Sequence, residues 1–297
     1  MKILITGANG FLGQHLTLFL AEKNYDVIAC SRGDSRIPQR FSFTYFPIDL
    51  TDEKAVSEFV SKISPDVIVH TAANSKPDDC HVNREGCLQQ NVEATKYLLN
   101  ALATQNNNAR FIYLSTDFIF GENGPHSEDD TTGPLNFYGE SKLMAEQVVK
   151  ESGVAYAIVR PVFIYGPVWN GVRSTFLHWV KNSLEQGKQI RVVSDQTRTP
   201  TFVTDICKGI EAIIRLNQQG DFHLAGKDLL SPYDMAVAVA SFLKLDAALI
   251  ENVTSESFVE PVQRAKRSGL KIEKAIKVLN YDPVDFAKGV ELTFNNN

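Results

Sequence analysis

The chain has 297 residues, 43% hydrophobic and 22% charged, proportions typical of a globular protein large enough for two domains. Its net charge of −5 provides no overall basic field for nucleic acid or an anionic membrane, so we expect neither partner. We expect a cytoplasmic protein, because no signal peptide is evident and no apolar run approaches the ~18 residues that span a bilayer. The four cysteines form no C-x-x-C pair, which predicts free thiols and no metal site.

Strand-like and helix-like segments alternate through the first half of the chain. Strands are predicted over 2–6, 26–30, 43–46, 66–70, 110–115 and 154–160, and helices over 11–23, 52–63, 86–105 and 138–151. Strands separated by helices form a parallel sheet that is covered on both faces. The pattern therefore predicts an α/β fold with a doubly wound parallel Rossmann sheet over residues 1–165.

The rhythm changes after about Tyr165. A helix is predicted over 174–186, short strands near 190–193 and 222–225, and further helices over 231–244 and 271–279. We expect residues 166–297 to form mainly a smaller α/β substrate-binding lobe. We also expect the chain to rejoin the Rossmann domain at about 195–225.

Three glycines lie where the first predicted strand passes into the first predicted helix, in the stretch LITGANGFLGQHL over 4–16. Because Gly costs up to ~1 kcal/mol relative to Ala in a helix, such a cluster indicates a close approach to the backbone. At this position the usual ligand is the pyrophosphate of a dinucleotide. The spacing G-x-x-G-x-x-G leaves a tight turn without ligand as the alternative. The predicted coenzyme contacts here are Gly7, Asn9, Gly10, Phe11, Leu12 and Gly13.

The end of the second strand bears on the choice of coenzyme. An NAD-selective site usually has an acid about 20 residues after the glycines, where this chain has Ser31 and Arg32. A guanidinium pairs well with a 2′-phosphate, which favours NADP(H), whereas the nearby Asp34 keeps NAD(H) as the alternative. After the third strand, Asp49 and Leu50 are expected either to contact the adenine or, for Asp49, to cap the next helix.

Tyr138 and Lys142 lie four residues apart at the start of a predicted helix, which puts them on one face. A phenol has a pKa of ~10, and an adjacent ammonium lowers it by ~1–3 units. We therefore predict that Tyr138 exchanges a proton with substrate while Lys142 lowers the tyrosine pKa and holds the nicotinamide ribose. A pair on a solvated helix surface is the alternative.

A polar strand end follows residues 110–115. Thr116 is predicted to bond a substrate carbonyl or hydroxyl, and Asp117 a sugar hydroxyl, because doubly wound folds bind ligands at this sheet edge. Capping of the strand end is the alternative for both residues.

Six motifs together resemble the extended short-chain dehydrogenase/reductase superfamily. They are TGANGFLG, HTAA at 70–73, NVEATKYLL from Asn91, LSTDFIFG, NFYGESK and RPVFIYG from Arg160. Within that superfamily, STDFIF and PLNFYGESK are most similar to the dTDP-4-dehydrorhamnose reductases, with support from DQTRTPT at 195–201. The reductases usually have Thr-Ser-Trp where this chain has Pro161, Val162 and Phe163.

This resemblance implies a Rossmann domain, a nucleotide-sugar lobe and Thr116, Tyr138 and Lys142 as catalytic residues. It implies further coenzyme contacts from Ala72, Ala73, Asn91, Ser115, Tyr138, Lys142, Pro161, Val162 and Phe163. The substrate residues expected from it are Asn74, Thr116, Asp117, Phe163, Arg198 and Arg264. The two arginines, together with Lys266 and Arg267, are expected either to hold a diphosphate or to form a solvated basic face.

The resulting hypothesis is an NADP(H)-dependent reductase of a 4-keto sugar nucleotide, with a homodimer as a further possibility. One alternative is a sugar-nucleotide epimerase or dehydratase that retains NAD. Dehydratases typically carry Asp-Glu after the threonine, where this chain has Asp117 and Phe118. The other alternative is a non-catalytic protein that binds NADP, because the chain also resembles the regulatory subunit of methionine adenosyltransferase.

Overall fold

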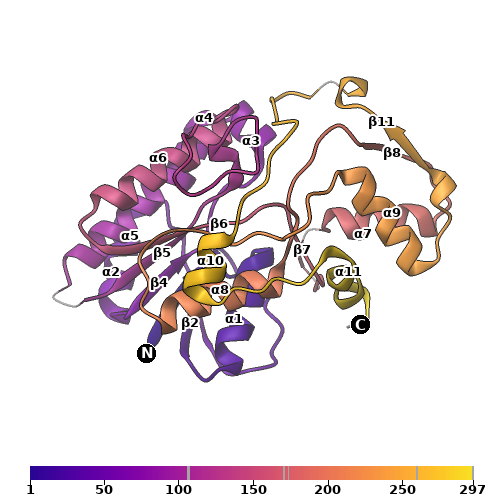
Figure 1. The fold of residues 1–297 in the computed structure, drawn as a ribbon. Coiled ribbons are helices and arrows are strands. Elements are labelled where there is room, and N and C mark those ends of the chain that lie inside the picture. The colour runs from indigo at the N-terminus through magenta and orange to yellow at the C-terminus, as the bar shows by residue number, and fades with distance from the viewer. Residues whose placement is uncertain (106–107, 170, 173, 259, 296–297) are drawn as a thin grey trace.

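The computed structural model describes residues 1–105, 108–169, 171–172, 174–258 and 260–295. Seven parallel strands form its central sheet in the order β10-β6-β5-β4-β1-β2-β3 (Figure 1). Their bounds are β1 Lys2–Thr6, β2 Asp26–Ser31, β3 Thr44–Pro47, β4 Val67–His70, β5 Arg110–Leu114, β6 Ala155–Arg160 and β10 Gly220–His223. The predicted Rossmann-type parallel sheet is confirmed.

Helices cover both faces of this sheet. One face carries α1 (Phe11–Glu22), α8 (Val203–Arg215) and α10 (Glu273–Leu279), and the other carries α2 (Glu53–Ile63), α5 (Ala94–Ala103) and α6 (Phe137–Glu151). Because strand side chains alternate, Ile3 and Ile5 pack in the core beneath α1 while Leu4 packs in the core beneath α5. Burial on both faces explains why the strands are almost continuously apolar.

The predicted helix over 86–105 is interrupted. Helices α3 (Pro77–Val82) and α4 (Arg84–Leu88) lead into a π-helical turn at Gln89–Glu93, after which α5 continues. Such turns are rare and often occur at functional sites. Here the turn places Gln90 at a cavity wall and buries Asn91.

A smaller lobe lies beside the sheet (Figure 1). Strand β8 (Ile190–Val193) pairs in parallel with β11 (Ile250–Val253), and helices α7 (Phe176–Glu185), α9 (Pro232–Leu243) and α11 (Phe286–Phe294) share a separate apolar core. Short 3-10 turns at Ala247–Leu249 and Ser255–Ser257 flank β11. The pair β7 (Ile164–Tyr165) and β9 (Thr201–Phe202) connects the lobe with the sheet. The domain boundaries at 165 and 195–225 stay a prediction.

The sequence pattern does not predict α8, which begins directly after β9 without a side-chain cap. In contrast, Ser231 and Asp234 form a reciprocal capping box at α9, the helix expected to begin at Ser231. Among the described residues, no helix combines the length and apolar character needed to cross a bilayer.

Candidate functional site

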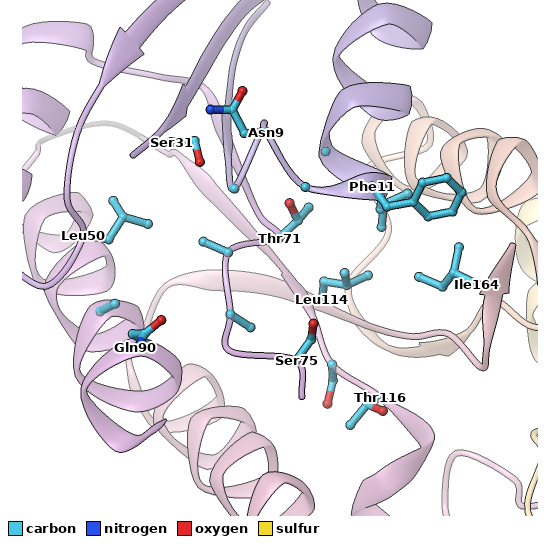
Figure 2. A pocket seen from close by; sticks show the side chains of 18 of the residues that line it. Asn9, Phe11, Ser31, Leu50, Thr71, Ser75, Gln90, Leu114, Thr116 and Ile164 are labelled. Carbon is cyan, nitrogen blue, oxygen red and sulfur yellow. The ribbon is translucent and has the colours of Figure 1, made fainter. Parts of the chain in front are cut away.

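A cavity of about 560 Å³ lies at the carboxyl edge of the central sheet. It is lined by the glycine turn and by residues that follow β2, β4 and β5, on both sides of the point where the strand order reverses between β1 and β4. Open α/β sheets bind ligands at this point, because the loops diverge there and leave a crevice. Figure 2 shows Asn9 and Ser31 at one end of the cavity, and Ser75 and Thr116 at the other.

The glycine turn forms one wall with bare backbone. Gly7 has a φ of +69°, and a Cβ atom added to it would lie 2.6 Å from the Ala72 nitrogen. A Cβ on Gly13 would lie 2.3 Å from the Gly7 oxygen, so α1 packs directly on the turn. The α1 N-terminus at Gly10 has no side-chain cap and no acid in its first turn. Its amides therefore suit the paired phosphates of a dinucleotide coenzyme, and the residues present fit that group.

Asn9 is committed to the loop after β2. Its Nδ2 donates to the Arg32 oxygen at 3.2 Å and the Asp34 oxygen at 2.9 Å, and its Oδ1 accepts from the Arg36 nitrogen at 2.8 Å. These bonds tie the glycine turn to the loop that bears on coenzyme choice. Ser31, Arg32 and Arg36 all line the cavity. The sequence pattern did not identify Arg36 as a coenzyme contact, although Arg36 is the last residue of the segment SRGDSR over 31–36, which begins with Ser31.

Asp49 and Leu50 line the same end of the cavity. Asp49 accepts hydrogen bonds from the Thr51 nitrogen at 3.0 Å and the Thr51 hydroxyl at 2.9 Å, which lower the pKa of its carboxyl. It is Asp52 that caps α2, by accepting from the Ala55 nitrogen at 3.0 Å. The capping alternative for Asp49 was therefore wrong.

Tyr138 and Thr116 meet at the opposite end of the cavity. Asn136 caps α6 by accepting from the Gly139 nitrogen, and Gly139 lies so close to the Phe118 oxygen that any Cβ would clash. This packing holds the start of α6 against the 3-10 turn at Asp117–Ile119, which Thr116 caps. Tyr138 is buried and lines the cavity, as does Thr116. The phenol thus reaches the cavity beside the threonine hydroxyl.

Lys142 lies behind this pair and does not line the cavity. Its Nζ donates to the Leu114 oxygen at 2.7 Å and lies 4.1 Å from the centre of the Tyr113 ring. Burial lowers the pKa of Lys142 to about 7, and burial raises the pKa of Tyr138 above the ordinary phenol value. In this structure the expected lowering of the Tyr138 pKa by Lys142 is therefore wrong, because desolvation dominates for both groups.

Most of the other predicted residues lie at the cavity. Phe11, Leu12, Ala72, Ala73, Ser115, Asp117, Pro161 and Phe163 line it. Asn91, Asn74 and Val162 do not: Asn91 is buried and holds Asn74 by accepting from its nitrogen at 2.7 Å and donating to its oxygen at 3.1 Å. Cavity residues that sequence reasoning missed include Ile48, Thr71, Ser75, Gln90, Leu114 and Ile164.

Arg198 and Arg264 line a second, much smaller cavity of about 20 Å³. It adjoins the first, with which it shares Asp117 and Phe118. Arg264 is paired with Asp78 at 3.0 Å and Glu260 at 3.1 Å. Of the four cations expected to hold a diphosphate, Lys266 and Arg267 do not line this cavity, Arg264 is already neutralised and the space is small, so a shared diphosphate site is not evident.

The chain is similar to several known proteins over almost its whole length. It is 30% identical to methionine adenosyltransferase 2 subunit beta from Rattus norvegicus over 279 residues, which cover 92% of this chain and 81% of that protein. It is 29% identical to the probable low-salt glycan biosynthesis reductase Agl14 from Haloferax volcanii, with 92% and 90% covered.

Among solved structures, the dTDP-4-dehydrorhamnose reductase from Bacillus anthracis in complex with NADP has a TM-score of 0.87 and 27% identity. The alignment covers 100% of this chain and 99% of that one. The model of the RmlD substrate binding domain matches residues 1–297. The chain therefore belongs to the RmlD substrate binding domain family, within the extended short-chain dehydrogenase/reductase superfamily.

Proposed function

We propose that, within this class of NAD(P)-dependent oxidoreductases, the chain is an NADP(H)-dependent reductase of a 4-keto sugar nucleotide. The observation that carries the proposal is that Tyr138 and Thr116 together line one end of the glycine-walled cavity. The predicted dTDP-4-dehydrorhamnose is the first substrate to test, since a reductase of that substrate has the same fold over the whole chain.

The glycine turn and the α1 N-terminus would hold the coenzyme phosphates, and Ser31, Arg32 and Arg36 would receive a 2′-phosphate. When bound, NADPH supplies a hydride to the ketone carbon. Tyr138 then donates its proton to the oxygen that becomes the alcohol, and Thr116 orients that oxygen. Lys142 holds the strand end at Leu114 and is within one helical turn of Tyr138.

Purified protein with NADPH and dTDP-4-dehydrorhamnose tests the proposal by the loss of absorbance of the reduced nicotinamide. We expect turnover with NADPH to exceed that with NADH, and we expect Tyr138→Phe to be slower by ~10²- to 10⁴-fold. No turnover by the wild type across a panel of 4-keto sugar nucleotides would reject the substrate class.

Two alternatives are tested on the same preparation. Stoichiometric NAD on the purified protein would favour an epimerase. The similarity to methionine adenosyltransferase 2 subunit beta favours, as a second candidate, a regulatory protein that binds NADP. Absence of turnover together with co-purification of a methionine adenosyltransferase catalytic subunit would support that candidate. The cytoplasmic location and the homodimer stay predictions.

A further inference from the structure

The small cavity beside the Tyr138 and Thr116 pair contains two buried charges that do not contact each other. Arg198 is 9% exposed and Asp117 is 7% exposed, and they influence each other electrostatically. Among the described residues, no ion pair within 4.0 Å joins them. Because buried charges are costly without a partner, their separation across a cavity calls for a group between them.

Arg198 has unused hydrogen-bonding capacity. Its Nη2 donates to the Gln196 Oε1 at 3.0 Å, and its guanidinium lies 5.5 Å from the centre of the Phe163 ring. Its Nε is buried and has no hydrogen-bond partner within the part of the chain that the structure describes. A buried guanidinium nitrogen can only donate, so this position requires an acceptor.

Asp117 presents the opposite requirement. Its Oδ1 accepts from the Thr116 hydroxyl at 3.2 Å and its Oδ2 from the Ser268 hydroxyl at 3.3 Å. A carboxylate offers about four acceptor positions, so Asp117 can take a further donor. Its partner Thr116 lines the main cavity together with Tyr138, next to the predicted position of the ketone.

The size of the cavity limits the group that bridges these residues. Its volume of about 20 Å³ holds one group of the size of a water molecule, since a single water needs roughly 10–15 Å³ measured in this way. A phosphate or carboxylate is too large and would meet the Asp117 charge. A hydroxyl fits, because it donates to the carboxylate and accepts from the guanidinium at the same time.

We propose that Asp117 and Arg198 form a subsite for the sugar hydroxyl on the carbon next to the ketone, the C3 hydroxyl of a 4-keto sugar. Asp117 accepts the hydroxyl proton and Arg198 donates to the hydroxyl oxygen, so that the ketone oxygen is directed toward Thr116 and Tyr138. This subsite rests on the proposed function and makes Arg198 a specificity-determining residue, not a ligand of the diphosphate.

Paired substrates test this subsite. We would measure kcat/KM for dTDP-4-dehydrorhamnose and its 3-deoxy analogue with the wild type, Asp117→Asn and Arg198→Gln. A hydrogen bond to a charged group predicts that the wild type prefers the hydroxylated sugar by about 10- to 100-fold. Each variant should lose most of that preference, mainly through slower turnover of the hydroxylated sugar. The Arg191→Gln variant, whose side chain on β8 is 49% exposed, is the matched control and should keep the preference.

A wild-type preference that persists in both variants would overturn the subsite, as would a wild type that does not distinguish the two sugars. In either case the enzyme still reduces 4-keto sugars, so the proposed function is unaffected. Turnover of neither sugar by the wild type would remove the proposed function and the subsite with it. If Arg198→Gln does not fold, Arg198→Lys keeps the charge, and its preference should fall because lysine has no donor at the Nε position.

Discussion

Replacement of Gly7 by alanine tests whether the bare glycine turn is a structural requirement of the coenzyme cavity. The new Cβ would lie 2.6 Å from the Ala72 nitrogen and 2.7 Å from the Ala72 Cα, so one backbone segment has to move. Gly7 also has a φ of +69°, a region that is unfavourable for residues with a side chain. Both effects act against the folded state.

The magnitude has two separable parts. The left-handed conformation costs ~1–2 kcal/mol for a residue other than glycine. Overpacking against a backbone that yields only partly adds ~1–3 kcal/mol. Gly7→Ala should therefore lower the free energy of unfolding by about 2–5 kcal/mol.

Gly153→Ala is the matched control. Gly153 has a φ of +73°, and a Cβ added there would meet nothing within 4 Å, so this variant has the conformational cost without the contact. We expect it to lose only ~1–2 kcal/mol in urea unfolding. The difference between the two variants isolates the approach of Gly7 to Ala72.

Coenzyme binding provides the second measurement. Movement of the turn displaces the α1 N-terminus, so Gly7→Ala should bind NADPH about 10- to 100-fold more weakly in calorimetry, while Gly153→Ala binds like the wild type. Equal destabilisation of the two variants would refute the contact argument. Unchanged NADPH affinity in folded Gly7→Ala would refute the assignment of the turn to the coenzyme.

Substitutions of Tyr138, Lys142 and Arg160 test three further points. Tyr138→Phe should lower kcat by ~10²- to 10⁴-fold with little change in NADPH affinity, and an equal kcat would exclude Tyr138 as the proton donor. Burial lowers the pKa of Lys142 to about 7 in the folded protein, whereas its pKa in the unfolded chain is ~10.4. Between these two pH values the unfolded chain binds more protons than the folded protein, so the free energy of unfolding rises with pH. Urea unfolding of coenzyme-free Lys142→Met should show a shallower rise across this window, and an unchanged slope would contradict the burial of a neutral amine. Arg160→Met leaves Glu146, 1% exposed, without its bidentate partner and should cost ~3–5 kcal/mol. Arg215→Ala, which removes an arginine that is 55% exposed from its pair with Glu211, should cost no more than ~1 kcal/mol.

Local patterns in the sequence were sufficient for the parallel sheet and most of its helices. Short apolar runs such as ILIT and VIVH are typical of strands buried on both faces, and the glycine turn depends on neighbours within a few residues. The motifs TGANGFLG and NFYGESK are also local patterns, and their resemblance to known motifs predicted which end of the sheet carries the site.

Other features depend on contacts between distant parts of the chain. Asn9 looks like a coenzyme ligand in the sequence, yet its amide is engaged by the loop around Arg36, 27 residues away. The directions of the Tyr138 and Lys142 pKa shifts could not be predicted from the sequence either. Residue spacing indicates which groups are near each other, but not how far burial removes them from water.

What the amino-acid sequence determined by itself was therefore the order of the elements and the types of residue at the carboxyl edge of the sheet, since both follow from local periodicity and backbone preference. What only the tertiary structure decided was how Arg198, from the segment before β9, faces Asp117, from the turn after β5, across a cavity of about 20 Å³. The physical reason is that burial and packing belong to surfaces that meet only when the chain is folded.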